Sequence, residues 1–274
     1  MRLADGYDPL LFDLDGVLFR GPEVVPGGPE TLDVLRAEGH RLAFVTNNSA
    51  RTPEAVAEML RGLGYRAEPG EVVTSALATA ELVGARRYAS AFVIGEEGIR
   101  RALAEAGVEV LDGEPERADC VVVGWDRQVT YAKLRRACLL VQRGAALIAT
   151  NDDRAFPAPD GLWPGAGALL AVVTTTTEAE AEVVGKPHPH LYRAAVRRIG
   201  DGRPLVIGDR LETDIAGANA LGWHSVLVLS GVTDADRARA SDVRPTYIVP
   251  DVRALLEPPP AARPDRPPGE PGQK

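Results

Sequence analysis

Short apolar runs alternate along the chain with amphipathic segments of helical length. The runs 9–15 and 41–46 predict strands, and the segments 28–39 and 52–64 predict helices, the second with Thr52 as its N-cap. Neither run alternates apolar with polar residues, which is typical of parallel strands covered on both faces. Strands that alternate with helices in this way predict an α/β fold built on a parallel sheet.

A second series with the same alternation occupies the middle of the chain. Its elements are strands at 90–95, 118–125 and 146–151 and helices at 96–107 and 130–144. The first series then resumes with a helix at 190–200, a strand at 204–209, a helix at 214–222 and a strand at 224–230. We therefore expect a core formed by residues 1–84 and 184–256, an inserted α/β domain at 85–183, and a disordered proline-rich tail at 257–274.

The composition is that of a soluble globular protein, with 45% hydrophobic and 26% charged residues. Because 39 acidic residues outnumber 31 basic ones, the net charge is -8 and no overall field attracts nucleic acid. An anionic ligand would need a local device, such as a metal ion or a well-placed lysine. Cys120 and Cys138 stand in apolar surroundings, which predicts buried reduced thiols instead of a metal pair or a disulfide.

The sequence predicts neither a secretion signal nor a membrane span. Asp5 and Asp8 stand where a signal peptide has a basic start and an apolar stretch. The longest uncharged stretch, 161–177, contains proline and glycine and falls short of about 18 consecutive apolar residues. We therefore expect no membrane contact and a location in the reducing cytoplasm.

Two carboxylates, Asp13 and Asp15, follow the first predicted strand and precede Gly16, which allows a sharp turn. The carboxyl end of a strand is where a doubly wound sheet binds its ligands. A calcium loop is excluded, since Val17 and Val24 occupy two of its ligand positions. The remaining alternative is a solvated turn, although two carboxylates this close repel each other unless a cation or a proton separates their roles.

Polar groups also follow the second strand and the inserted segment. Thr46 ends the second strand and leads into Asn47, so its hydroxyl and the next backbone N–H could hold a phosphate oxygen. The alternative is a loop that caps its own backbone. Lys186 lies between Gly185 and Pro187, a turn that could aim one ammonium group into a cleft, and a lone surface lysine is the alternative. A P-loop is excluded because its flanking residues are missing.

A third strand end carries Asp209, with Asp214 five residues further on at the predicted start of a helix. Two carboxylates there suit a hard divalent cation bound through oxygen, above all Mg²⁺. Asp214 also has a structural explanation, because an aspartate is a good helix N-cap.

Four motifs, DLDGVL, VTNNS, GKP and GDRLETD, occur in this order and resemble the haloacid dehalogenase superfamily of phosphohydrolases. The resemblance covers about residues 9–256 and implies a Rossmann-like, doubly wound parallel core. Only 32 residues separate Asp13 from Thr46, whereas 139 separate Thr46 from Lys186, so an inserted cap must lie in the second gap. This is similar to the type-two cap of the IIA branch, which holds NagD-type nucleotidases and the p-nitrophenyl phosphate and phosphoglycolate phosphatases. The segment TTTTEAEAEVVG departs from the pattern, since a glycine-containing turn is expected there.

The resemblance implies a role for each acidic residue. Asp13 is the nucleophile that forms an aspartyl phosphate, and Asp15 is the general acid and base. Mg²⁺ is held by Asp13, the backbone carbonyl of Asp15, and Asp209, while Asp214 supports the metal or orients Lys186 from outside the ligand set. An aspartate at position 15 favours phosphate transfer over dehalogenation, because an alcohol leaving group needs a proton.

The resemblance also implies a phosphate grip made by Thr46, the N–H of Asn47, and Lys186. Substrate choice falls to the inserted domain, where Asn151 and Asp153 follow a strand, with turn formation as the alternative explanation. The expected partner is a small phosphorylated metabolite, either a sugar, glycerol or glycolate phosphate or a nucleotide. A homodimer paired through the inserted domains is also implied.

Two other classes of function stay open to test. A catalytically silent binding or regulatory module on the same fold would be expected to lose an aspartate at position 13 or 15, and both are present. A dinucleotide-dependent oxidoreductase lacks its main support, because no G-x-G-x-x-G follows the first strand.

Overall fold

The computed structural model describes residues 1–158 and 160–260, which form an α/β protein with two parallel sheets. The six-stranded sheet has the order β15-β14-β13-β1-β4-β5. Its strands are β1 (Leu10–Phe12), β4 (Leu42–Thr46), β5 (Val72–Thr74), β13 (Leu205–Gly208), β14 (His224–Val228) and β15 (Tyr247–Val249). The separate five-stranded sheet has the order β12-β9-β8-β6-β7. Its strands are β6 (Ser90–Ile94), β7 (Glu109–Leu111), β8 (Cys120–Val123), β9 (Ala146–Ala149) and β12 (Glu182–Val183). The predicted fold class is confirmed.

Two compact units divide the chain. One contains Met1–Leu42 and the described residues from Gly202 onward, and the other is Ala43–Asp201. The five-stranded sheet lies wholly in the second unit, between residues 90 and 183. Domain boundaries at 85 and 183 stay a prediction, and residues 261–274 of the predicted tail lie outside the described part of the chain.

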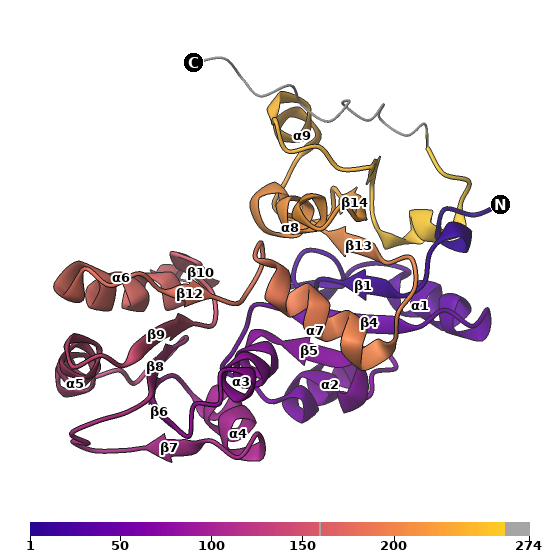
Figure 1. Cartoon of the computed structure of the whole chain (residues 1–274). Coiled ribbons are helices and arrows are strands. Elements are labelled where there is room, and N and C mark those ends of the chain that lie inside the picture. The colour runs from indigo at the N-terminus through magenta and orange to yellow at the C-terminus, as the bar shows by residue number, and fades with distance from the viewer. Residues whose placement is uncertain (159, 261–274) are drawn as a thin grey trace. The chain divides into compact units, whose positions relative to one another are not determined.

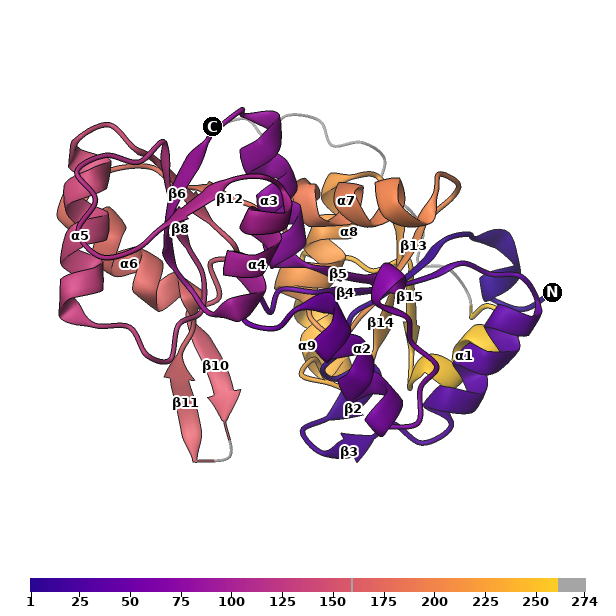
Figure 2. The same cartoon turned by 90° about the horizontal axis from the view of Figure 1, so that it is seen from below.

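The first unit is built around β1, β13 and β14, which are labelled in Figure 1, and β15, which is labelled in Figure 2. These strands pair in parallel, with Leu10 opposite Leu205 and Phe12 opposite Ile207. All residues of β1 and β13 are buried, which explains why their sequences do not alternate. Its helices are α1 (Gly28–Ala37), α8 (Ala216–Ala220) and α9 (Ala235–Ala240).

The second unit begins with the parallel pair β4 and β5, in which Thr46 lies opposite Thr74. Its first helices are α2 (Pro53–Gly62) and α3 (Ser75–Ala85), and α7 (Pro189–Ile199) packs on α3. The side chain of Thr52 accepts a hydrogen bond from the backbone N–H of Ala55, so the predicted N-cap is confirmed.

The five-stranded sheet has its own apolar core. Three helices pack on it: α4 (Glu97–Glu105), α5 (Tyr131–Gln142) and α6 (Ala166–Thr177). Figure 2 shows α5 and α6 on one face and α4 on the other. Buried side chains of β6, β8 and β9 meet those of α5 and α6, with Cys138 among them. Cys120 and Cys138 are both buried free thiols, as predicted.

The sequence analysis did not predict the short strands β7 and β12, and it also missed two larger features of this region. A β-hairpin of β10 (Ala155–Ala158) and β11 (Gly161–Pro164) precedes α6, although its prolines and glycine favour a loop. The uncharged residues that follow the hairpin form the helix α6.

The predicted N-cap at Asp214 is wrong. The helical residues begin earlier, with a π-helical turn at Leu211–Ile215 that runs into α8. Asp214 lies inside this turn, and its carboxylate accepts a hydrogen bond from the backbone N–H of Arg210. The Asp214 carboxylate therefore pairs with the backbone N–H at the start of the turn, the role that an N-cap side chain usually has. Every helix of the described residues is too short or too polar to cross a lipid bilayer.

Candidate active site

Asp13 and Asp15 directly follow β1 in a turn that requires glycine. The backbone N–H of Asp13 donates to the carbonyl of Ile207 on β13, which continues the strand pairing by one residue. Gly16 has a φ of 82° and donates its N–H to the carbonyl of Phe19. A Cβ atom at Gly16 would overlap the carboxylate of Asp209. The turn after β1 therefore lies directly against the end of β13.

Asp209 follows β13 and is completely buried, and Asp214 is only 1% exposed. The Oδ2 atom of Asp209 accepts a hydrogen bond from the backbone N–H of Val232 at 2.7 Å. Glycines surround both carboxylates, because a Cβ atom at Gly231 would overlap Asp209 and one at Gly208 would overlap Asp214. The absence of a Cβ atom at these glycines thus leaves the space that the carboxylates of Asp209 and Asp214 occupy.

Asp13, Asp209 and Asp214 form one cluster. Each contributes a carboxylate oxygen, and these oxygens lie within 4.8 Å of one another. Three carboxylates at this spacing, two of them buried, repel one another unless a cation or protons compensate. Oxygen donors that leave positions for water are the ligands that Mg²⁺ prefers. The donor set therefore fits the predicted magnesium site, and it includes Asp214 beside Asp13 and Asp209.

Asp15 differs from the clustered carboxylates because its side chain is exposed. Burial by the surrounding protein atoms nevertheless raises the pKa of its carboxyl above the usual value. The charge of Arg210 and a hydrogen bond from the N–H of Gly16 lower this pKa by smaller amounts. A carboxyl with a raised pKa holds its proton closer to neutral pH, which suits a general acid and base.

The predicted phosphate-binding residues lie in the second unit. Thr46 ends β4 and is buried, and its hydroxyl oxygen accepts a hydrogen bond from the N–H of Asn48. Its own hydroxyl proton can then point to an anion. Lys186 is 3% exposed, and its Nζ donates to the carbonyl of Val45, next to Thr46. The surface-lysine alternative is therefore wrong, because a lysine buried at this strand end is not a solvated side chain.

Hydrogen bonds join Asn47 to Lys186 and to the two residues predicted to set specificity. Asn47 pairs with the backbone of Lys186, its Nδ2 donates to Oδ2 of Asp153, and its carbonyl accepts from Nδ2 of Asn151. Asn151 also accepts from the N–H of Asp153, a local turn of the kind the alternative explanation expected. Thus the structure brings Asn47, Asn151, Asp153 and Lys186 together, although Lys186 comes 139 positions after Asn47.

Sequence reasoning missed Ser49 and Thr150, which join the same loops. Ser49 is buried, and its Oγ accepts a hydrogen bond from the hydroxyl of Thr150 at 3.1 Å. The only signal was that each residue adjoins a motif, Ser49 in VTNNS and Thr150 before Asn151.

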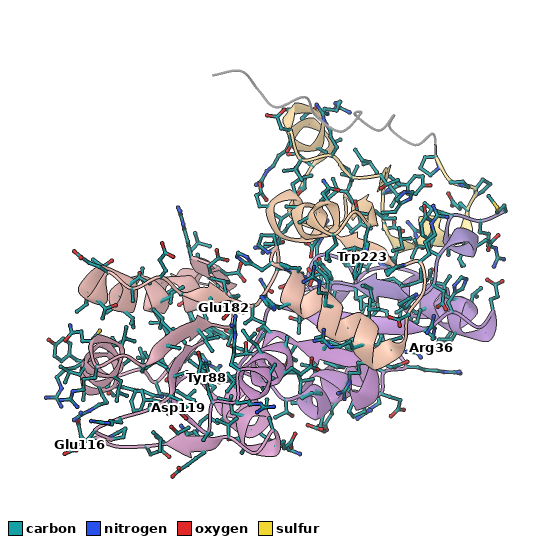
Figure 3. All side chains as sticks on the ribbon, in the orientation of Figure 1. Arg36, Tyr88, Glu116, Asp119, Glu182 and Trp223 are labelled. Atoms are coloured by element: carbon teal, nitrogen blue, oxygen red, sulfur yellow. The ribbon has the colours of Figure 1, made fainter. Side chains whose placement is uncertain are left out.

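A cavity of about 1040 Å³ lies elsewhere in the second unit, near the start of β6 and β8. Tyr88, Glu116 and Asp119 line it, and Figure 3 shows them at the end of the five-stranded sheet. The carboxylate of Asp119 accepts hydrogen bonds from the N–H groups of Ala89 and Ser90. None of the predicted site residues lines this cavity, so its size does not identify the active site.

Comparison with known proteins identifies the family. The description "Haloacid dehalogenase-like hydrolase" matches residues 10–109, and "HAD-hydrolase-like" matches residues 183–255. The acid sugar phosphatase of Staphylococcus aureus (strain USA300) is 39% identical over 253 residues, which are 91% of this chain and 97% of that protein.

Solved structures agree with this assignment. A crystal structure of glycerol phosphate phosphatase from Mycobacterium tuberculosis in complex with magnesium has a TM-score of 0.90 and 37% identity, covering 94% of this chain and 79% of that chain. The p-nitrophenyl phosphatase from Archaeoglobus fulgidus has a TM-score of 0.85 and 32% identity, covering 92% and 99%. The predicted family and the predicted class of enzyme, a phosphatase, are confirmed. This chain belongs to the haloacid dehalogenase-like hydrolase family, in its branch of NagD-type and p-nitrophenylphosphatase-type phosphatases.

Proposed function

We propose that this protein is an Mg²⁺-dependent phosphatase that hydrolyses small-molecule phosphomonoesters through an aspartyl phosphate on Asp13. The observation that carries the proposal is the cluster of Asp13, Asp209 and Asp214, whose oxygens lie within 4.8 Å of one another at the ends of β1 and β13. Such a cluster is costly in a fold unless it binds a cation. The exposed Asp15, two residues beyond Asp13, supplies the proton-transferring group that ester hydrolysis needs.

In the first step, an oxygen of Asp13 attacks phosphorus while the bond from phosphorus to the leaving oxygen breaks. Asp15 transfers its proton to that oxygen, so the product leaves as an alcohol. In the second step, a water molecule attacks the aspartyl phosphate and gives a proton to Asp15. The bond from phosphorus to Asp13 breaks, and inorganic phosphate leaves with both aspartates restored. The raised pKa of Asp15 supports both of its roles.

Three groups hold the phosphoryl oxygens in this proposal: the hydroxyl of Thr46, the N–H of Asn47 and the ammonium of Lys186. Support comes from the burial of Thr46 and Lys186 and from the hydrogen bond between Lys186 Nζ and the carbonyl of Val45. A buried ammonium attracts an anion more strongly than an exposed one because water screens it less. This is the local positive charge that a chain of net charge -8 needs in order to bind phosphate.

Asp13, the backbone carbonyl of Asp15, and Asp209 would hold the metal ion, with Asp214 supporting it from beside the ligand set. When bound, Mg²⁺ neutralises the nucleophilic carboxylate and the phosphate, which otherwise repel each other. The relative from Mycobacterium tuberculosis was crystallised in complex with magnesium, which supports the choice of ion.

Sugar phosphates and glycerol phosphate are the substrates we propose first, because relatives that match nearly the whole chain are named for them. Thr46, Asn47 and Lys186 bind the phosphate that all these esters share. The enzyme can therefore distinguish the esters only by contacts with their alcohol part. Asn151 and Asp153 are the proposed specificity residues, since both are joined to the phosphate grip through Asn47. A homodimer paired through residues 85–183 is also part of the proposal, and sedimentation velocity tests it.

Release of p-nitrophenol from p-nitrophenyl phosphate tests the proposal. We expect turnover with MgCl₂, none after EDTA treatment, and recovery when Mg²⁺ is restored. Asp13→Asn should abolish turnover and leave the thermal denaturation temperature within a few degrees. Asp236→Asn removes the same charge from an exposed side chain on α9 and should retain full activity. No release by the wild-type protein would favour the silent module, and activity in Asp13→Asn would reject the nucleophile. A panel of sugar, glycerol and glycolate phosphates and nucleotides then ranks the substrates.

A further inference from the structure

Three loops of the second unit meet at the side chain of Asn47. They are the loop after β4 (46–50), the loop after β9 (150–153) and the segment that joins β12 to α7 (184–188). Asn47 Oδ1 accepts from the N–H of Lys186 at 2.8 Å, and Asn47 Nδ2 donates to the carbonyl of Lys186 at 3.1 Å. One carboxamide therefore pairs with both backbone groups of the lysine, as a neighbouring β-strand would.

The same carboxamide extends to the loop after β9. Asn47 Nδ2 donates its second proton to Oδ2 of Asp153 at 3.1 Å. The backbone carbonyl of Asn47, separate from its carboxamide, accepts hydrogen bonds from Nδ2 of Asn151 at 2.8 Å and from the hydroxyl of Ser75 at 2.6 Å. Both protons of the carboxamide and one lone pair of its oxygen are thus in use, three of the four hydrogen bonds that an asparagine side chain can make.

Close packing at Gly185 leaves this arrangement little room to shift. A Cβ atom there would lie 2.6 Å from Asn47 Oδ1, 2.6 Å from the carbonyl of Thr150 and 2.8 Å from Asn151 Cβ. Two of these three atoms belong to the loop after β9, and the third is the carboxamide oxygen itself. The backbone before Lys186 is therefore pressed against both other loops.

From these contacts we infer that the side chain of Asn47 is a positioning residue that holds Lys186 in place and ties it to Asp153. The inference rests on the proposed function, in which Lys186 binds the phosphoryl group. It extends that function to the loop after β9, whose residues are proposed to contact the alcohol part of the substrate. Because one carboxamide bonds to both Lys186 and Asp153, a displacement of the loop after β9 changes the position of the lysine backbone. Substrate selection and phosphate binding are then coupled through a single side chain.

A charge exchange between positions 47 and 153 tests the inference. Asn47→Asp keeps an acceptor for the N–H of Lys186 but loses both donated bonds and places a carboxylate beside Asp153. We expect the inhibition constant for inorganic phosphate to rise tenfold or more, and KM for p-nitrophenyl phosphate to rise with it. Asp153→Asn keeps an oxygen that can accept from Asn47, so its inhibition constant for inorganic phosphate should rise less than that of Asn47→Asp. In the double variant N47D/D153N, the new amide donates to the new carboxylate, and most of the lost phosphate affinity should return.

Asn48→Asp is the matched control. It adds the same charge one residue away, where Asn48 Oδ1 accepts from the N–H of Ala50, a bond that aspartate retains. Its inhibition constant should stay within twofold of wild type. If Asn47→Asp does not fold, Asn47→Ser removes the pairing without adding a charge and should show the same loss.

Two results would overturn the inference: phosphate inhibition of Asn47→Asp equal to that of Asn48→Asp, or a double variant no better than Asn47→Asp. A rescue by the second substitution is not expected from a general loss of packing. Failure of the proposed function would be separate and visible, because the wild-type enzyme itself would then release no p-nitrophenol.

Discussion

Asp214→Asn removes one negative charge from the cluster of Asp13, Asp209 and Asp214 while it nearly preserves the shape of the side chain. The amide oxygen can still accept the hydrogen bond from the N–H of Arg210. Without metal, the variant should therefore be more stable than the wild type. Mg²⁺ should stabilise the variant less than it stabilises the wild type, because the bound ion loses a nearby negative charge.

The cluster geometry sets the size of the effect. Two unit charges 4.8 Å apart repel by about 3.5 kcal/mol at an effective dielectric constant of about 20. Asp214 takes part in two such pairs. This sum is an upper bound, however, because solvent and relaxation of the surrounding polar groups screen part of the repulsion. Hydrogen bonds to the carboxylates offset part of the repulsion, so we expect the metal-free variant to gain about 2 kcal/mol in free energy of unfolding.

Urea denaturation in EDTA and in saturating MgCl₂ measures both quantities. If Asp214→Asn weakens Mg²⁺ binding tenfold, stabilisation by a fixed excess of Mg²⁺ falls by about 1.4 kcal/mol. The exposed Asp236→Asn, with the same change of charge, should shift neither value by more than about 0.5 kcal/mol. A metal-free Asp214→Asn that is less stable than wild type, together with an unchanged response to Mg²⁺, would refute the reasoning.

Three further predictions concern the second unit. Burial raises the pKa of Cys120 to about 12 and Cys138 is also buried, so the native protein should not react with Ellman's reagent at pH 8, whereas the urea-unfolded protein should. Hydrogen bonds from Arg127 lower the pKa of Glu96, so the pair stabilises the fold above the unfolded pKa and this contribution is lost as pH falls through the lowered value. Arg127→Gln should therefore cost less than about 1 kcal/mol at pH 7, since the arginine is exposed, and the difference in melting temperature should shrink between pH 5 and pH 3. Leu103 on α4 is fully buried, so Leu103→Ala should cost about 2–5 kcal/mol in urea denaturation, and a loss below 1 kcal/mol would contradict the described core.

Local patterns were enough to predict most of the elements. The apolar runs that became β1, β4 and β13 are buried throughout, so their composition alone marks them as parallel strands. Thr52 caps α2 through a bond within four residues, which sequence reasoning can recognise. The hairpin of β10 and β11 was missed because proline and glycine are the strongest local signals for a loop.

Sequence alone also identified the residue types of the site and the family that they resemble. Asp13 directly follows an apolar run, and Asp15 and Lys186 stand beside a glycine or a proline, so these positions follow from neighbours along the chain.

Only the tertiary structure decided how those residues combine. Asp214, for which the sequence left metal support and a helix cap as alternatives, lies in a π-helical turn that brings its carboxylate into the cluster with Asp13. Asn47, predicted for its backbone N–H, uses its side chain to hold a lysine 139 positions away. The direction of a side chain depends on packing between segments that are distant in sequence, and local propensity carries no information about it. The sequence therefore determines which chemical groups the site contains, while the fold determines which of these side chains contact one another.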